Sequence, residues 1–352
     1  MTIRPSIDVN LFVYNAADTI TETIDSILTQ SWPDLRLTVI DNASTDDTPA
    51  IVARTPDRRI HLIRNRINVG PVLNCQRAFW HGGSDFVMPK TGDDLLAPDF
   101  IAELMDTLLR HPETAMCHAA GLIFDDDRTV RATYPPTHSL DATSPDPVAR
   151  ARHVMARYTS APAFWGIYRR ASIERLAPLA YRPGWDHAVL AELALYGEIR
   201  SIDAPLFWRR HGGKNVADLA RGCSQFTQRN LPLDDALADV LWHIPLTATA
   251  YGHIERFAVA RIGAPERRAL MQSVPPLFRA RWLPMMRREA DHFRIVLPDL
   301  LDRLAAEHGT AAIWAGRQIT DALTVLHALV PEADFGPDRS AVEALSAGLI
   351  AA

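Results

Sequence analysis

The stretch Lys90-Thr91-Gly92-Asp93-Asp94 follows an apolar segment, residues 86–88, that has the length of a short buried strand. Pro98 then opens a segment with one apolar helical face, because proline is favoured in the first turn of a helix. Two adjacent carboxylates therefore lie between the end of a strand and the start of a helix, where open α/β sheets bind ligands. Hard cations such as Mg²⁺ bind one or two carboxylates together with substrate phosphates. Asp93 and Asp94 thus suit a metal–diphosphate site, and a solvated Gly-Asp-Asp turn is the alternative.

The composition is that of an ordinary globular protein. The chain has 352 residues, of which 47% are hydrophobic and 22% charged, enough for a sizeable core and two or three domains. The net charge of −5 argues against general nucleic-acid binding. The three cysteines are widely spaced and form neither a disulfide framework nor a zinc pattern. Since we find no signal-peptide pattern and no apolar run of membrane-spanning length, we expect a cytoplasmic protein.

Strand-length and helix-length segments alternate along the first third of the chain. Apolar runs of strand length occupy residues 7–14, 35–40, 60–63 and 86–88. Helical patterns separate them, and the first begins with a capping box at Thr19 and Glu22. This alternation predicts an α/β fold with a mostly parallel, Rossmann-like sheet and helices on both faces.

Five short motifs follow one another in this region. They are Tyr14-Asn15, Ser26-Ile27-Leu28-Thr29-Gln30, Asp41-Asn42-Ala43-Ser44-Thr45-Asp46-Asp47-Thr48, Asn68-Val69-Gly70 and Thr91-Gly92-Asp93-Asp94. In this order and spacing, residues 7–125 resemble the nucleotide-sugar half of the family-2 glycosyltransferases, which have the GT-A fold. The resemblance implies an inverting enzyme that moves a sugar from a nucleoside diphosphate to an acceptor hydroxyl.

The resemblance also implies which residues bind the donor. The predicted nucleotide-binding residues are Val13, Tyr14, Asn15, Asp41, Asn68, Gly70, Arg77, Thr91, Gly92 and Asp93. Asp41 is suited to accept a hydrogen bond from a pyrimidine N–H, and Tyr14 to stack on the base or contact its edge. UDP is the expected carrier, with dTDP and GDP as alternatives. The metal, Mg²⁺ or Mn²⁺, is expected on Asp93, Asp94 and His211.

Three features depart from the family pattern. Phe12-Val13 replaces the usual Pro-Thr, so a hydroxyl near the nucleoside is missing. Thr91 replaces the first aspartate of the Asp-x-Asp motif. Residues 74–77, Asn-Cys-Gln-Arg, replace the usual Ala-Arg-Asn and resemble a variant ending in Arg77. These changes leave the metal shell and the nucleotide open, but not the fold.

The middle of the chain is the predicted acceptor half. Residues 126–162 are rich in Pro, Asp, Arg and Ser and predict a long loop region with a weak helix near 147–158. Residues 163–170 resemble the family's strand behind the acceptor pocket. Trp165 in this segment is a candidate acceptor contact, although core packing is the favoured interpretation.

Asp186 resembles the family's catalytic base at the start of a helix. A helix N-cap is the alternative, because carboxylates are favoured there. Its place after Asp94 and shortly before His211 favours the base. Trp185 is a candidate acceptor contact, whereas His187 is predicted to face solvent.

Residues 207–215 resemble the family's Arg-x-His-x-x-(Ser/Asn) segment. The resemblance implies that His211 closes over the diphosphate and completes the metal shell, while Arg210 and Lys214 contact phosphate oxygens or the acceptor. Histidine is a common metal ligand, and Gly212-Gly213 gives the loop freedom to close.

The remaining residues predict a separate helical region. The predicted domains are a GT-A domain, 1–222, with halves 1–125 and 126–222, and an α-helical domain, 223–352. The sequence leaves open whether the helical domain binds the acceptor, forms a homo-oligomer or contacts the inner membrane peripherally. Residues 274–293 mix apolar residues with arginines, as in a segment lying on an anionic membrane. A helix pair kinked at Pro284 with a buried apolar face is the favoured alternative.

The expected acceptor is a glycan, a lipid-linked sugar or a protein, in bacterial polysaccharide or glycoconjugate synthesis. Two alternatives come from other functional classes. A non-catalytic sugar-nucleotide-binding protein of the same fold is suggested by Val13 and Thr91. A sugar-nucleotide pyrophosphorylase would carry a glycine-rich basic loop after its first strand, where this chain has Tyr14-Asn15-Ala16-Ala17-Asp18.

Overall fold

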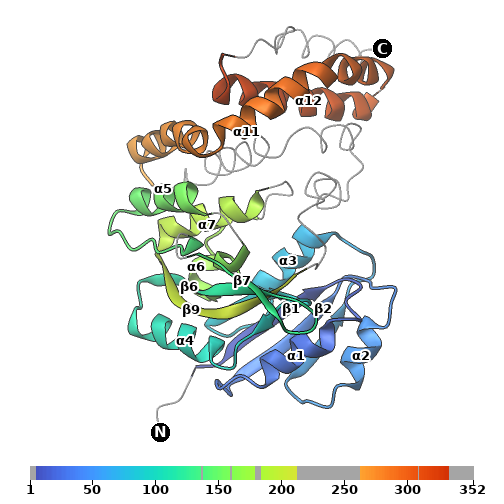
Figure 1. Cartoon of the computed structure of the whole chain (residues 1–352), viewed down its shortest axis with the longest axis vertical. Coiled ribbons are helices and arrows are strands. Elements are labelled where there is room, and N and C mark those ends of the chain that lie inside the picture. The colour runs from blue at the N-terminus through green and yellow to red at the C-terminus, as the bar shows by residue number, and fades with distance from the viewer. Residues whose placement is uncertain are drawn as a thin grey trace. The chain divides into compact units, whose positions relative to one another are not determined.

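The computed structural model describes residues 5–135, 138–158, 161–178, 184–211, 262–307 and 309–332 (Figure 1). The chain divides into two compact units, one of residues 1–179 and 189–214 and the other of residues 180–188 and 215–352. The predicted domain boundary between residues 222 and 223 lies outside the described residues and stays a prediction.

Four parallel strands form the first half of the first unit, in the order β3-β2-β1-β4. These strands are β1 (Ile7–Val13), β2 (Leu35–Asp41), β3 (Ile60–Arg64) and β4 (Phe86–Thr91). The helices between them are α1 (Ile20–Leu28), α2 (Thr48–Arg54) and α3 (Pro71–Trp80). Parallel neighbours need a crossover connection, and these helices supply it. The predicted α/β architecture is confirmed, and the four strands end at the same edge of the sheet.

The second half of the unit extends this sheet with mixed strand directions. From β4 the order continues β8-β6-β9-β5, and β7 pairs with β6. These strands are β5 (Leu95–Leu96), β6 (Thr114–Phe124), β7 (Val130–Thr133), β8 (Ile167–Arg169) and β9 (Glu198–Arg210). Within the antiparallel pair β5–β9, Leu95 lies opposite Trp208. This pairing holds the turn at residues 91–94 beside the C-terminal end of β9.

Part of the predicted loop region 126–162 has regular structure. Helix α5 (Pro147–Arg157) confirms the helix predicted there, and Asp146 caps it by accepting a hydrogen bond from the Val148 N–H at 2.9 Å. Strand β7 was not predicted, because its four residues are all exposed and the run is too short for a pattern.

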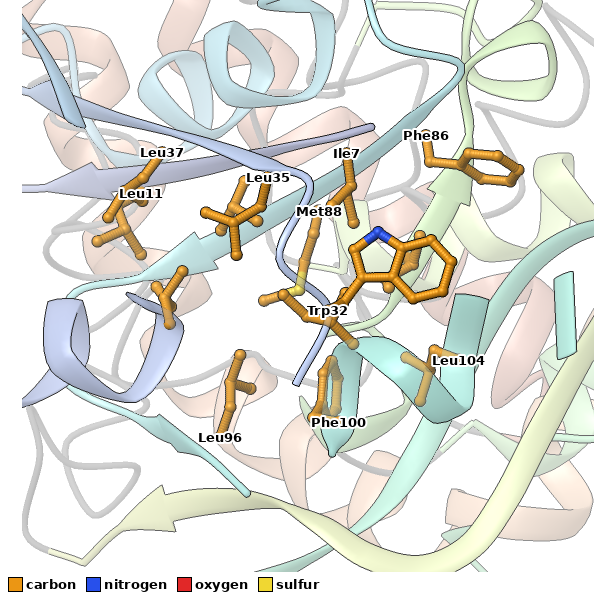
Figure 2. Packing of buried hydrophobic residues seen from close by; sticks show 14 of the residues in the cluster. Ile7, Leu11, Trp32, Leu35, Leu37, Phe86, Met88, Leu96, Phe100 and Leu104 are labelled. Carbon is orange, nitrogen blue, oxygen red and sulfur yellow. The ribbon is translucent and has the colours of Figure 1, made fainter. Parts of the chain in front are cut away.

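The core of the first unit lies between the sheet and its helices. Figure 2 shows Trp32, Phe100 and Leu104 beside the strand residues Ile7 and Met88. None of these five side chains is more than 3% exposed. Phe100 and Leu104 belong to α4 (Phe100–Arg110), which presents one apolar face to the core. Packing of α4 therefore anchors the chain directly after the 91–94 turn.

The second unit is helical in its described part, as predicted. It contains α11 (Ala264–Ala306) and α12 (Gly309–Leu329), which pack against each other. Residues 264–306 form one helix that continues through Pro284, so the predicted helix pair is wrong. The expected burial of its apolar residues is confirmed at Phe278 and Met286, whereas it is wrong for Met285, which is exposed. None of the described helices is long and apolar enough to cross a membrane.

Candidate active site

Gly92 determines how the turn after β4 approaches β1. A Cβ atom at this position would lie 2.7 Å from Val13 Cγ1, closer than side-chain carbons normally approach. The Thr19 hydroxyl donates a hydrogen bond to the Gly92 carbonyl oxygen at 2.7 Å. Val13, which replaces the hydroxyl residue of the family pattern, therefore packs directly on the turn that carries the two aspartates.

The Asp94 side chain is buried, and both of its carboxylate oxygens have polar neighbours. Its Oδ1 accepts a hydrogen bond from the Arg210 backbone N–H at 3.0 Å, and its Oδ2 lies 3.5 Å from the Thr91 hydroxyl. Burial raises the pKa of Asp94 to about 7, and the neighbouring Asp93 charge adds to this rise. Two carboxylates in a desolvated turn repel each other, and a bound cation would relieve that repulsion.

Lys90 is a residue of this site that the sequence interpretation missed. Its side chain is completely buried, and Nζ donates a hydrogen bond to the Asp94 carbonyl oxygen at 2.6 Å. Burial lowers the pKa of Lys90, while the charges of Asp94 and Asp93 oppose that shift. The available signal was its rarity, since Lys90 and Lys214 are the only lysines in the sequence.

Asp93 has the character of a cation ligand. Its Oδ1 is buried and has no hydrogen-bond partner among the residues that the structure describes. A buried carboxylate oxygen without a donor is costly unless a ligand compensates it, so these two carboxylates fit a hard divalent cation. No group of three or more His, Cys, Asp or Glu side chains that suits a metal ion occurs in the described ranges. Asp93, Asp94 and His211 are therefore not gathered into the predicted three-ligand set.

Arg210 and His211 lie at the end of β9 with acidic neighbours. Arg210 donates hydrogen bonds to Glu22 and Asp126 and to the Asp93 carbonyl oxygen. Its guanidinium thus links α1, the 91–94 turn and the β6–β7 connection. The ring Nδ1 of His211 lies 3.3 Å from Asp125 Oδ1, a different carboxylate from the predicted pair. The predicted phosphate contact Lys214 lies outside the described residues.

The predicted nucleoside residues lie in the loops at the same edge of the sheet. Tyr14, directly after β1, is 37% exposed. Asn15 adopts a positive φ of 49° and connects two loops, because its N–H donates to the Ser44 hydroxyl and its Oδ1 accepts from the Thr45 N–H. Asp41 is fully buried at the end of β2.

A network of buried asparagine amides supports Asn68, Gly70 and Arg77. Asn42 donates to Asn68 Oδ1 at 2.7 Å and to the Gly70 carbonyl oxygen at 3.3 Å. Asn65 donates to Asn42 Oδ1 at 2.9 Å and accepts a hydrogen bond from the Arg77 guanidinium. The network brings the three predicted residues together, and Asn65 is a member that no sequence motif indicated.

Trp165 packs against aromatic residues of the sheet domain. Its ring centroid lies 5.9 Å from that of Phe12 and 4.9 Å from that of Phe164. It is partly buried against the hydrophobic core, as the favoured interpretation predicts.

Trp185 and Asp186 open helix α7 (Trp185–Tyr196), and both belong to the second compact unit. Asp186 lies within the first turn, not at the N-cap, so the capping alternative does not describe its position. The Asp186 side chain is 32% exposed, and its Oδ1 lies 3.4 Å from His187 Nδ1. His187 is buried against Trp282, with ring centroids 6.1 Å apart. The prediction that His187 faces solvent is therefore wrong.

Comparison with known proteins identifies the sheet domain. Residues 9–176, nearly half of the chain, match the model of the family described as Glycosyl transferase family 2. The chain is 31% identical over 129 residues to EpsE of Bacillus subtilis (strain 168), described provisionally as a glycosyltransferase, with coverage of 36% of this chain and 46% of that protein. It is 31% identical over 102 residues to the succinoglycan biosynthesis protein ExoO of Rhizobium meliloti (strain 1021), with coverage of 29% of each. The chain thus spans less than half the length of both relatives.

The solved structures add evidence on the fold. The structure of S. aureus TarS 1-349 in complex with UDP-GlcNAc has a TM-score of 0.60, is 15% identical and is matched over 97% of this chain and 92% of that one. At this identity the likeness establishes the fold alone. Residues 9–176 of the chain therefore match the model of glycosyltransferase family 2, and the sheet domain has the GT-A fold.

Proposed function

We propose that the protein is an inverting glycosyltransferase that moves a sugar from a nucleoside diphosphate sugar, with UDP as the carrier, to an acceptor hydroxyl. The observation that carries the proposal is the turn at Asp93 and Asp94. Within a family-2 domain, it presents a buried carboxylate oxygen without a partner at the ligand-binding edge of the sheet. A solvated turn, the alternative interpretation, would leave both carboxylates hydrated.

Asp93 and Asp94 would hold Mg²⁺ or Mn²⁺, which supplies positive charge to the leaving diphosphate when bound. Other groups of the chain hold the two carboxylates in position before the donor binds. Lys90 fixes the turn through the Asp94 carbonyl oxygen, and Arg210 fixes it through Asp94 Oδ1 and the Asp93 carbonyl oxygen. Charge stabilisation is most effective when such groups need not reorganise during the reaction.

Asp186 is the proposed general base. Its carboxylate would take the proton of the acceptor hydroxyl while that oxygen attacks the anomeric carbon from the face opposite the diphosphate, which inverts the configuration. Two features support the role: its place in the first turn of α7, where helix N–H groups favour the ionised form, and its partial exposure. Trp185 beside it is the proposed acceptor contact.

UDP is the proposed carrier, and a bacterial polysaccharide or glycoconjugate is the proposed product class. The fold neighbour TarS is described in complex with UDP-GlcNAc, and ExoO is described as a succinoglycan biosynthesis protein. The first description supports a sugar nucleotide as the donor, and the second supports a polysaccharide or glycoconjugate pathway.

The test is a panel of UDP-, dTDP- and GDP-sugars incubated with the purified chain and Mn²⁺, with release of nucleoside diphosphate as the readout. Release from one donor, increased by acceptor sugars, is the expected result. Folded protein that binds a donor without ever releasing its nucleotide would be the non-catalytic binding protein. Folded protein that neither binds nor consumes any of the donors would contradict the proposal.

A further inference from the structure

Helix α11 carries four arginines close together in the sequence, and one of them differs from the others. Arg279 and Arg287 both pair with Glu332, at 3.5 Å and 2.9 Å. Arg288 is exposed to solvent. Arg281 is partly buried, and its Nη1 atom is buried without a hydrogen-bond partner among the residues that the structure describes. Arg281 is therefore the arginine of this group whose charge is desolvated and is compensated by no described carboxylate.

The burial of Arg281 is unfavourable for the folded chain. A guanidinium removed from water loses its hydration, and that loss is offset only when an anion or other acceptors take the place of the water. Burial lowers the pKa of Arg281 to about 10, and no carboxylate in the described part of the chain opposes this shift. The side chain thus stays charged at neutral pH. Such an arrangement is expected where a ligand supplies the missing anion.

A series of ring contacts connects Arg281 to the proposed general base. Arg281 Cζ lies 4.3 Å from the centre of the Trp282 ring, so a cation–π contact holds the guanidinium. The Trp282 ring lies 6.1 Å from that of His187, whose Nδ1 is 3.4 Å from Asp186 Oδ1. These four residues belong to the same compact unit. The uncompensated cation is therefore close to the start of α7, where the proposed base would accept the proton of the acceptor hydroxyl.

We propose that Arg281 binds an anionic group of the acceptor, a phosphate or a carboxylate, near the hydroxyl that Asp186 deprotonates. This inference rests on the proposed function and narrows its substrate class to negatively charged acceptors. A guanidinium suits either group, because its planar N–H groups match two oxygens of a carboxylate or a phosphate. Trp282 orients the guanidinium before the ligand binds, so little ordering of the Arg281 side chain opposes binding.

The experiment is calorimetric titration of the full chain saturated with UDP and Mg²⁺, so that the proposed donor site is already occupied. The probes are glucose 1-phosphate, glucuronate and glucose, which share a sugar ring and differ in charge. We expect both anions to bind the wild type about 10- to 100-fold more tightly than glucose, the gain for one hydrogen bond to a charged group. Arg281→Met should bind the anions no better than glucose.

Arg288→Met is the matched control. Arg288 is an exposed arginine of the same helix and makes no hydrogen bond or ion pair among the described residues. Its replacement removes the same charge from α11, so it should leave the preference for anions unchanged.

The stability of Arg281→Met separates ligand binding from a structural role. If Arg281 serves only to stabilise the helices, its replacement should lower the free energy of unfolding in urea. Under the proposal, a neutral side chain removes an uncompensated buried charge, so Arg281→Met should be as stable as the wild type or more stable. A variant that loses stability but keeps the preference for anions overturns the inference. Should Arg281→Met fail to fold, Arg281→Lys carries the binding test: it keeps the charge without the planar group and should bind both anions more weakly than the wild type.

The binding results distinguish the remaining outcomes. UDP-saturated wild type that binds the two anions no better than glucose overturns the inference, and so does an equal loss of all three probes in Arg281→Met. Tighter binding of glucose 1-phosphate than of glucuronate supports the inference with phosphate as the acceptor group, and the reverse order supports it with a carboxylate. Wild-type protein that does not bind UDP refutes the proposed function, and the assignment of Arg281 falls with it.

Discussion

Gly92→Ala tests how the site turn is built. The added Cβ would lie 2.7 Å from Val13 Cγ1, so either β1 or the turn must shift. Overpacking of this kind costs about 1–3 kcal/mol, and the lower chain entropy of alanine in the unfolded state returns about 0.4–1 kcal/mol. We therefore expect a net loss of about 1–2 kcal/mol in the free energy of unfolding, measured by urea denaturation.

Gly83→Ala is the matched control, since a Cβ there meets no atom within 4 Å. It should leave the stability unchanged or raise it slightly. Val13→Ala removes the atom that clashes, so Gly92→Ala should cost less in the Val13→Ala background. If Gly92→Ala is as stable as Gly83→Ala, or if the effects of the Val13 and Gly92 substitutions are additive, close packing of Val13 on Gly92 does not limit the turn.

Three further predictions concern two buried groups and the proposed general base. Lys90→Met should cost about 3 kcal/mol of unfolding free energy, because the Asp94 carbonyl oxygen loses its hydrogen bond and the buried Asp94 carboxylate loses a nearby positive charge. The cost should be clearly smaller in an Asp94→Asn background, and equal costs in urea denaturation would contradict this electrostatic coupling. Burial lowers the pKa of His118, so the unfolded chain binds its proton more readily and stability should fall as pH drops below about 6.5. His118→Gln should make stability less dependent on pH between about 7 and 5, and an unchanged slope would count against this assignment. Asp186→Asn should lower turnover about 10²- to 10⁴-fold with donor affinity and melting temperature nearly unchanged; a loss confined to stability would mean a structural role.

The fold could be predicted because its signals are local. The alternating apolar and helical segments of residues 7–108 each span enough residues to show their period, and short motifs mark the strand ends. Strand β5 could not be predicted: two residues, Leu95 and Leu96, show no period, and their partners in β9 are more than a hundred residues away. Pairing at that sequence distance depends on the tertiary fold.

The site was predicted less completely because several of its polar residues are buried, although residues of these types usually lie at the surface. Lysine and histidine are mostly exposed or intermediate, so no local signal indicated that Lys90 and His187 are buried. Asn65 lies outside the family motifs and acts only through Asn42 and Arg77. Motifs indicated the loops that carry the candidate site residues, whereas the contacts that hold those loops come from residues distant in the sequence.

We propose that Asp93 and Asp94 form the cation-dependent diphosphate site of a nucleotide-sugar enzyme. The most direct test is calorimetric titration of UDP, with and without Mn²⁺, into the wild type and the Asp93→Asn, Asp94→Asn double variant. Asp99→Asn is the control, an exposed aspartate nearby whose side chain makes no capping hydrogen bond. We predict that Mn²⁺ strengthens UDP binding to the wild type and to Asp99→Asn, but not to the double variant. Equal Mn²⁺ dependence in a folded double variant would mean that Asp93 and Asp94 do not hold the cation.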